Sequence, residues 1–133
     1  MTHPLFDLSG KVALITGSTR GIGKSMAEEH ARAGAKVVIS SRKADSCEAV
    51  RAEFEKAGWP VIAQACNVSR KEELQALVDL TMKTWGRIDI AIANAASLRT
   101  LEWEPFRRAE TGWEIYAPLI AREIGVDCSP RSE

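Results

Sequence analysis

Three glycines in the stretch Thr16–Gly23 have the spacing of a loop that binds phosphate groups. The first glycine would let the chain turn sharply off a strand, and the other two would let backbone N–H groups approach a pyrophosphate. The dipole of the helix that follows would favour the bound negative charge. The stretch is therefore a candidate dinucleotide site. Its candidate contacts are Gly17, Ser18, Thr19, Arg20, Gly21, Ile22 and Gly23.

Two other interpretations of this loop are weaker. A P-loop would match Gly23, Lys24 and Ser25, but that motif requires glycine at position 18, where this chain has Ser18. It would also need an aspartate at the end of a nearby strand to bind Mg²⁺, and none is evident. A glycine-rich turn without a ligand would lose backbone entropy with no evident return in packing.

The residues after the second predicted strand favour NADP(H) over NAD(H). In NAD-binding folds of this type an acidic residue about 20 residues past the glycine loop holds the ribose 2′-hydroxyl. This chain has Ser41, Arg42 and Lys43 there, and a guanidinium can pair with a 2′-phosphate instead. Arg20 could reach the same phosphate. The alternative is that Arg42 and Lys43 are solvated charges that open a helix, although cations are mildly unfavourable at a helix N-terminus.

Short apolar segments alternate strictly with amphipathic segments from Lys11 to Ala93. The predicted strands are Lys11–Thr16, Lys36–Ser41, Pro60–Ala65 and Arg87–Ala93. The predicted helices are Ile22–Ala33, Ala44–Ala57 and a third from Ser69, with stops at Gly34, Gly58 and Gly86. This alternation predicts the α/β class: a doubly wound parallel sheet, Rossmann-like, with strand order 3-2-1-4.

Each predicted helix carries an apolar stripe that should face the sheet. The stripes are Ile22, Met26 and Ala27; Ala49, Val50 and Phe54; and Leu74, Leu77, Val78 and Met82. At the start of the third helix, Ser69 and Glu72 have the spacing of a capping box. The stripes predict a core on both faces of the sheet.

The composition is that of a globular chain with balanced charge. The sequence has 133 residues, 45% of them hydrophobic, and a formal net charge of zero, so it lacks the basic excess of a nucleic-acid-binding domain. No apolar run approaches the roughly 20 residues that span a bilayer, and Asp7 interrupts the segment where a signal peptide would be apolar. We expect a soluble cytoplasmic protein without a metal site, with Cys47, Cys66 and Cys128 as free thiols.

By these motifs the chain resembles the short-chain dehydrogenase/reductase family over roughly residues 5–97. The loop matches the family's Thr-Gly-x-x-x-Gly-x-Gly spacing, and the residues from Ser41 to Lys43 look like its NADP-preferring members. The resemblance implies that the Asn67 side chain contacts the adenine amine, with the Val68 backbone alongside, where the family usually has Asp-Val. It also implies that Asn94 and Ala95, which resemble part of the family's Asn-Asn-Ala-Gly motif, steady the sheet beside the adenosine ribose.

The resemblance implies hydride transfer between NADP(H) and a carbonyl or alcohol substrate, but the family's catalytic residues are missing from this chain. The family uses a Ser and a Tyr-x-x-x-Lys pair, in which the tyrosine donates a proton and the lysine lowers its pKa. Tyr116 is the single tyrosine, Ile120 stands four residues on, and no lysine follows Lys83. We therefore expect no catalytic residue here, and an NADP(H)-binding portion that is inactive on its own.

The sequence divides into an NADP-binding half, residues 1–97, and an atypical tail, residues 98–133, where the composition shifts abruptly. The shift predicts a chain truncated before the catalytic half, with a tail from another frame, another exon or an imperfect gene model; the alternative is a genuine cap. A non-catalytic nucleotide- or partner-binding module and a nonfunctional truncation product remain open as functions. An uncovered fourth strand would also leave an apolar sheet edge, through which the chain could form oligomers.

Overall fold

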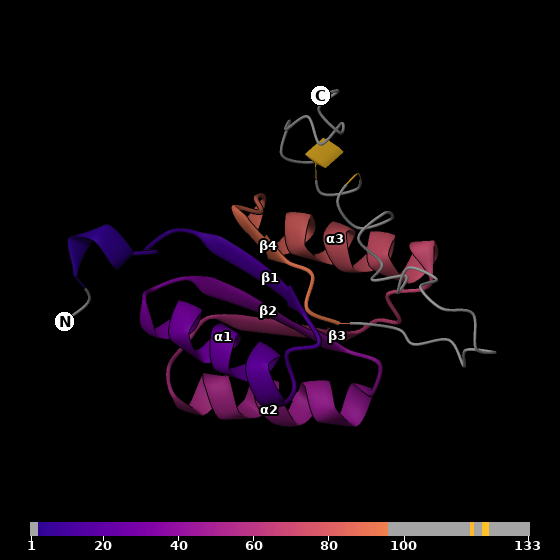
Figure 1. The fold of residues 1–133 in the computed structure, drawn as a ribbon, viewed down its shortest axis with the longest axis horizontal. Helices are drawn as coiled ribbons and strands as arrows, with labels where there is room; N and C mark the ends of the chain where they lie inside the picture. The colour runs from indigo at the N-terminus through magenta and orange to yellow at the C-terminus, as the bar shows by residue number, and fades with distance from the viewer. Residues whose placement is uncertain (1–2, 96–117, 119–120, 123–133) are drawn as a thin grey trace, which may run out of the picture.

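Four parallel strands alternate with three α-helices in the computed structural model, which describes residues 3–95, 118, 121 and 122 (Figure 1). The strands are β1 (Val12–Thr16), β2 (Lys36–Ser41), β3 (Val61–Ala65) and β4 (Ile90–Ile92). The helices are α1 (Gly21–Arg32), α2 (Ala44–Lys56) and α3 (Lys71–Trp85), after a short 3-10 helix, η1 (Pro4–Phe6). The sheet order is β3-β2-β1-β4, which confirms the predicted fold class and strand order.

β1 lies in the centre of the sheet, and all five of its residues are buried. Its register places Val12 beside Lys36 of β2 and Ala13 beside Ile90 of β4. Figure 1 shows α1 and α2 on one side of the sheet and α3 on the other. Strand residues that alternate in direction therefore supply two separate cores. The buried side chains on the α3 side include Val12, Leu14, Val38, Leu74, Leu77 and Val78, with Met82 packed against them.

The second core, between the sheet and the other two helices, differs from the predicted stripes at two positions. Ile22 is 76% exposed, because it lies in the first turn of α1, beyond the end of β1. Ala49 is also exposed, and Cys47 joins Val50 and Phe54 on the buried side of α2. Cys47, Val50 and Phe54 follow the i, i+3, i+7 spacing of one helix face, which Ala49 does not share.

The predicted capping box at the third helix is wrong. α3 begins at Lys71 with Arg70 as its N-cap and no side-chain cap, so Ser69 lies before the helix. Glu73 accepts a hydrogen bond from the backbone N of Asn67 at 2.6 Å and another from Arg70 Nη1 at 3.1 Å. The turn between β3 and α3 is thus stabilised by the carboxylate of Glu73, and not by the predicted Glu72.

β4 is shorter than the predicted strand Arg87–Ala93, and side-chain hydrogen bonds join the flanking residues to β1 in addition to the backbone bond from Asp89 N to Val12 O at 3.0 Å. Before β4, Asp89 Oδ2 accepts a hydrogen bond from the backbone N of Val12 at 2.9 Å. The Arg87 guanidinium, bonded to the same carboxylate, lowers the pKa of Asp89. After β4, the backbone N of Asn94 donates to the Thr16 hydroxyl. Among the described residues β4 pairs only with β1, and an oligomer through its edge stays a prediction.

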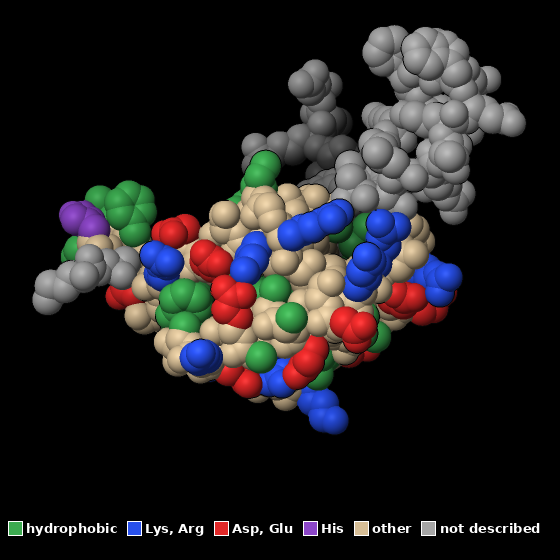
Figure 2. Space-filling model, turned by 90° about the horizontal axis from the view of Figure 1, so that it is seen from below, with side chains coloured by type: hydrophobic (Ala, Val, Ile, Leu, Met, Phe, Trp, Pro, Cys, Tyr) green, Lys and Arg blue, Asp and Glu red, His purple; other side chains and the backbone are tan. Residues whose placement is uncertain are grey.

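The surface formed by α1 and α2 carries both acidic and basic side chains, as the space-filling view from that side shows (Figure 2). In the part of the chain that the structure describes, no helix is long and apolar enough to cross a membrane. The same part contains no group of three His, Cys, Asp or Glu side chains that could hold a metal ion. Tyr116 and Cys128 lie outside the described residues; of the tail, Arg122 Nη2 donates to Gln75 Oε1 of α3 at 3.2 Å.

Candidate functional site

The predicted site residues all lie at or directly after the carboxyl ends of the parallel strands. Residues 17–23 follow β1, residues 42–43 follow β2 and Ser41 ends it, residues 67–68 come after β3, and residues 94–95 come after β4. In doubly wound sheets this edge binds ligands, because the loops that leave it open toward the same side. The topology therefore brings together four segments that are separated by up to 78 positions in the sequence.

Gly23 is required by packing inside the protein. A Cβ at position 23 would lie 2.0 Å from the Gly17 carbonyl oxygen and 2.6 Å from Asn94 Nδ2, both far inside normal contact distance. Gly17 lies on the other side of this contact, with a φ of 65° and with Asn94 Nδ2 3.0 Å from the place of its own Cβ. Two of the three glycines thus let the first turn of α1 sit directly on the end of β1 and on Asn94.

Gly21 has a different role, because the space beside it is open. Its φ is 57°, in the left-handed region that disfavours other residues, and a Cβ there would meet nothing within 4 Å. The N-cap residue of α1, Arg20, makes no side-chain cap, and the first turn contains no acidic residue. The first N–H groups of a helix lack partners within it. This end of α1 is therefore suited to an anion.

Thr16 joins the end of β1 to the chain after the edge strand β4, and it was not among the site residues predicted from the sequence. Its hydroxyl is buried, accepts hydrogen bonds from the backbone N of Asn94 and of Ala95, each at 3.1 Å, and donates to Ile92 O at 3.5 Å. Asn94 Nδ2 in turn donates to Gly17 O at 3.1 Å. A hydroxyl residue at the end of an otherwise apolar strand was the available signal. The Thr16 and Asn94 side chains fix the loop after β4 against the glycine loop.

Ser18 is fully buried and is bonded to the sheet. Its hydroxyl donates to Ile15 O at 2.8 Å and accepts from the backbone N of Ser40 at 2.9 Å. Its own backbone N donates to Ser40 O at 3.0 Å. Neither its N–H nor its hydroxyl is therefore free for a ligand in this structure, in contrast to the uncapped end of α1.

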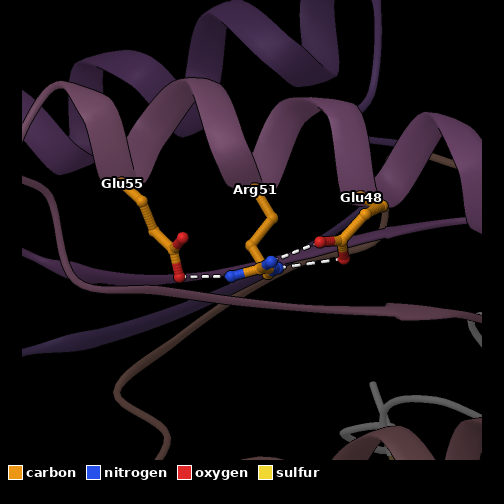
Figure 3. Close-up of polar contacts among 3 residues, drawn as sticks. All are labelled: Glu48, Arg51 and Glu55. Carbon is orange, nitrogen blue, oxygen red and sulfur yellow. Dashed lines mark hydrogen bonds and ion pairs between the residues drawn. The ribbon is translucent and has the colours of Figure 1, made fainter.

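In the part of the chain from residue 3 to 95, two arginines at this edge lack the carboxylate partners that the other arginines there have. Arg51 on α2 is bonded to Glu48, at 2.9 Å through Nε, and to Glu55, and these carboxylates raise its pKa (Figure 3). Within residues 3–95, every arginine except Arg20 and Arg42 has such an ion pair. Both exceptions are exposed. Their positive charge is available to an anionic ligand.

Lys24 does not point toward a phosphate site. Its Nζ lies 2.8 Å from Glu53 Oε2 on α2 and 3.9 Å from Glu28 Oε1 on its own helix. The hydrogen bond to Glu53 raises the pKa of Lys24. A P-loop lysine must instead reach the phosphates of its nucleotide. The position of Lys24 therefore argues against the P-loop alternative.

The segment after β3 includes a side-chain donor, that of Asn67, and a buried thiol, that of Cys66. Asn67 Oδ1 accepts from the backbone N of Ser69 at 3.0 Å, and the Asn67 amide nitrogen has no partner among the described residues. Val68 is buried against the α3-side core. Burial, and secondly the charge of Glu73, raise the pKa of the Cys66 thiol to about 11. Cys66 and Cys47 are buried and free, as predicted.

Comparison with known proteins gives consistent matches to one family. The family model described as short chain dehydrogenase matches residues 11–115. A short-chain dehydrogenase/reductase of Pestalotiopsis microspora is 45% identical over 94 residues, which are 70% of this chain and 36% of that protein. The 2-dehydro-3-deoxy-D-gluconate 5-dehydrogenase of Formosa agariphila is 39% identical over 100 residues, 74% of this chain and 38% of that protein. The chain thus spans little more than a third of these relatives.

The fold of the chain is also similar to solved structures. A short-chain type dehydrogenase/reductase from Mycobacterium marinum has a TM-score of 0.77 and 36% identity, covering 90% of this chain and 52% of that one. A short chain dehydrogenase/reductase from Burkholderia phymatum, solved in complex with NAD, has a TM-score of 0.78 and 25% identity, covering 89% of this chain and 45% of that one.

Proposed function

The chain belongs to the short-chain dehydrogenase family, whose members are oxidoreductases that use a nicotinamide dinucleotide, and we propose that its described part is the NADP(H)-binding portion of such an enzyme. The observation that carries this proposal is the presence of the open, uncapped start of α1 at Gly21 together with two arginines, Arg20 and Arg42, that have no carboxylate partner among the described residues. The first feature fits a pyrophosphate, and the second fits an additional phosphate.

Each segment at the carboxyl edge would take one part of the cofactor. The backbone from Thr19 to Ile22 would bind the pyrophosphate through N–H groups at the start of α1, with Gly17 and Gly23 shaping the turn. Ser41, Arg42, Lys43 and Arg20 would surround the 2′-phosphate. Asn67 and Val68 would lie beside the adenine, and Asn94 and Ala95 beside the adenosine ribose. Bound NADPH supplies the hydride in the family's reaction.

NAD(H) is the alternative cofactor, since the Burkholderia phymatum relative was solved with NAD. The sequence at the end of β2 argues against it, because an NAD site of this type uses an acidic residue there to accept a hydrogen bond from the ribose 2′-hydroxyl. Here Ser41 and Arg42 stand at that point, and Arg42 has no ion pair among the described residues. A 2′-phosphate would supply the missing negative charge.

Replacing Arg42 by alanine is expected to weaken NADPH binding about 10- to 100-fold and to change NADH binding about twofold or less. The loss should be selective because the guanidinium would meet only the 2′-phosphate, which NADH lacks. Titration of the chain with each cofactor by calorimetry measures both constants. Arg51→Ala is the matched control, since this arginine is already paired with Glu48 and Glu55 on α2. Equal losses for the two cofactors, or tighter binding of NADH by the unmodified chain, would contradict NADP(H) selectivity.

For the 133-residue chain we further propose binding without turnover, with a carbonyl or alcohol as substrate only in a complete enzyme. The sequence has no Tyr-x-x-x-Lys pair that could protonate a carbonyl, since Tyr116 is followed four residues later by Ile120. NADPH oxidation with a panel of aldehydes and ketones tests this directly. Turnover that depends on Arg42 would establish an active enzyme. Absence of both turnover and cofactor binding would favour a nonfunctional product or a partner-binding module.

A further inference from the structure

Ser18 extends the pairing of β1 and β2 past the point where the two chains should separate. The regular register ends where Thr16 lies beside Ser40. Gly17 then turns the chain away with its φ of 65°. Ser18 nevertheless returns to Ser40, with its backbone N 3.0 Å from Ser40 O and its hydroxyl 2.9 Å from Ser40 N. Both backbone polar groups of Ser40 are thus bonded to one residue of the glycine loop.

The end of β2 is fixed from its other side as well. The backbone N of Cys66, after β3, donates to Ser41 O at 2.8 Å. The Ser41 hydroxyl accepts from the backbone N of Lys43 at 3.3 Å. The chain from Ser40 to Lys43 is therefore held between the glycine loop and the end of β3. Within the described residues neither Arg42 nor Lys43 of this stretch has an ion pair.

We propose that Ser18 is a positioning residue that sets the cofactor preference by fixing the glycine loop against the end of β2. This inference rests on the proposed NADP(H) site. The glycine loop would take the pyrophosphate and Arg42 the 2′-phosphate, so the relative position of the two segments decides whether one cofactor reaches both. Ser18 is 0% exposed and both its polar groups are bonded inside the protein. It acts through Ser40 and not by contact with the ligand.

Ser18→Ala tests this role, because alanine fits the site and removes only the hydroxyl. Thr81→Val is the matched control: Thr81 is also fully buried, and its hydroxyl donates to Leu77 O within α3, on the other side of the sheet from α1. The first readout needs no cofactor. Amide hydrogen exchange at Lys43, which Ser18 does not touch, should become faster in Ser18→Ala and stay unchanged in Thr81→Val.

The second readout is the ratio of the dissociation constants for NADH and NADPH. In Ser18→Ala the preference for NADPH should fall about two- to tenfold, as expected when one buried hydrogen bond is lost, whereas Thr81→Val should keep the ratio of the unmodified chain. Unchanged exchange at Lys43, or an unchanged ratio, would overturn the positioning role while leaving the NADP(H) site in place. Failure of the unmodified chain to bind either cofactor would overturn the site and this role together.

Discussion

Gly23→Ala should destabilise the protein by about 3 kcal/mol, at the upper end of the range for overpacked sites, and should abolish dinucleotide binding. The added Cβ would lie 2.0 Å from Gly17 O, a backbone atom that the Asn94 side chain fixes through a 3.1 Å hydrogen bond. Neither the glycine loop nor Asn94 can move away without separating the start of α1 from the end of β1. Urea denaturation measures the free energy of unfolding, and titration with NADPH measures binding.

Gly21→Ala is the control for this prediction, because it changes a glycine of the same loop without a steric conflict. Its cost should be about 1–2 kcal/mol, the penalty of the left-handed conformation alone, since nothing lies within 4 Å of the new methyl group. The fold should persist, with weaker NADPH binding because the methyl group would stand on the side where the pyrophosphate is proposed to lie. Equal destabilisation by the two substitutions would show that the contact at Gly23 is not the cause.

Thr16→Val is the second substitution with a large expected effect, about 2–3 kcal/mol of lost stability. Valine has nearly the same shape but cannot accept the hydrogen bonds from the backbone N of Asn94 and of Ala95. The partly buried N–H of Ala95 would remain unpaired, and the N–H of Asn94 would keep only its 3.1 Å hydrogen bond to Ile92 O. The change should also weaken cofactor binding, since it releases the loop after β4 from the glycine loop. Urea denaturation and the NADPH titration again provide the two measurements.

Thr81→Val separates the loss of acceptor bonds from the simple loss of a buried hydroxyl. The Thr81 hydroxyl only donates, to a carbonyl oxygen of the preceding turn of α3, and no backbone N–H depends on it. Its replacement should cost about 1 kcal/mol or less. A Thr16→Val variant as stable as Thr81→Val would show that the Ala95 N–H finds water as a partner.

The strands and helices could be predicted from the sequence because each buried segment carries its own signal. β1 and β2 are short, β-branched and buried, so the apolar runs alone locate them. The start of β4 could not be located in this way. Ile88 continues the apolar alternation of Ile90 and Ile92 to a position before β4, where the Asp89 side chain bonds to Val12 N and to Arg87. The bond from Asp89 to Val12 joins residues 77 positions apart, and no local pattern records it.

The residue types of the candidate site could be predicted from the sequence, but the contacts and hydrogen bonds between them could not. The glycine spacing and the lack of an acid after β2 could be read directly, whereas the separate reasons for Gly21 and Gly23 depend on the position of Asn94. Nothing in the local sequence distinguishes Ser18 from an exposed serine in a loop. Only the fold shows that it is buried and bonded to Ser40. A residue whose role depends on a hydrogen bond to a backbone group far along the chain produces no local pattern in the sequence.

The bonds from Asn94 and Ala95 back to Thr16 and Gly17 also determine when the site can form during synthesis. They connect positions 77 to 79 residues apart. Ribosomes add roughly 5–20 residues per second. The glycine loop is therefore made at least several seconds before the residues that give it its shape, so the nascent loop cannot recruit cofactor to assist the early steps of folding. Dinucleotide at the proposed site would stabilise the chain only after β4 has joined the sheet.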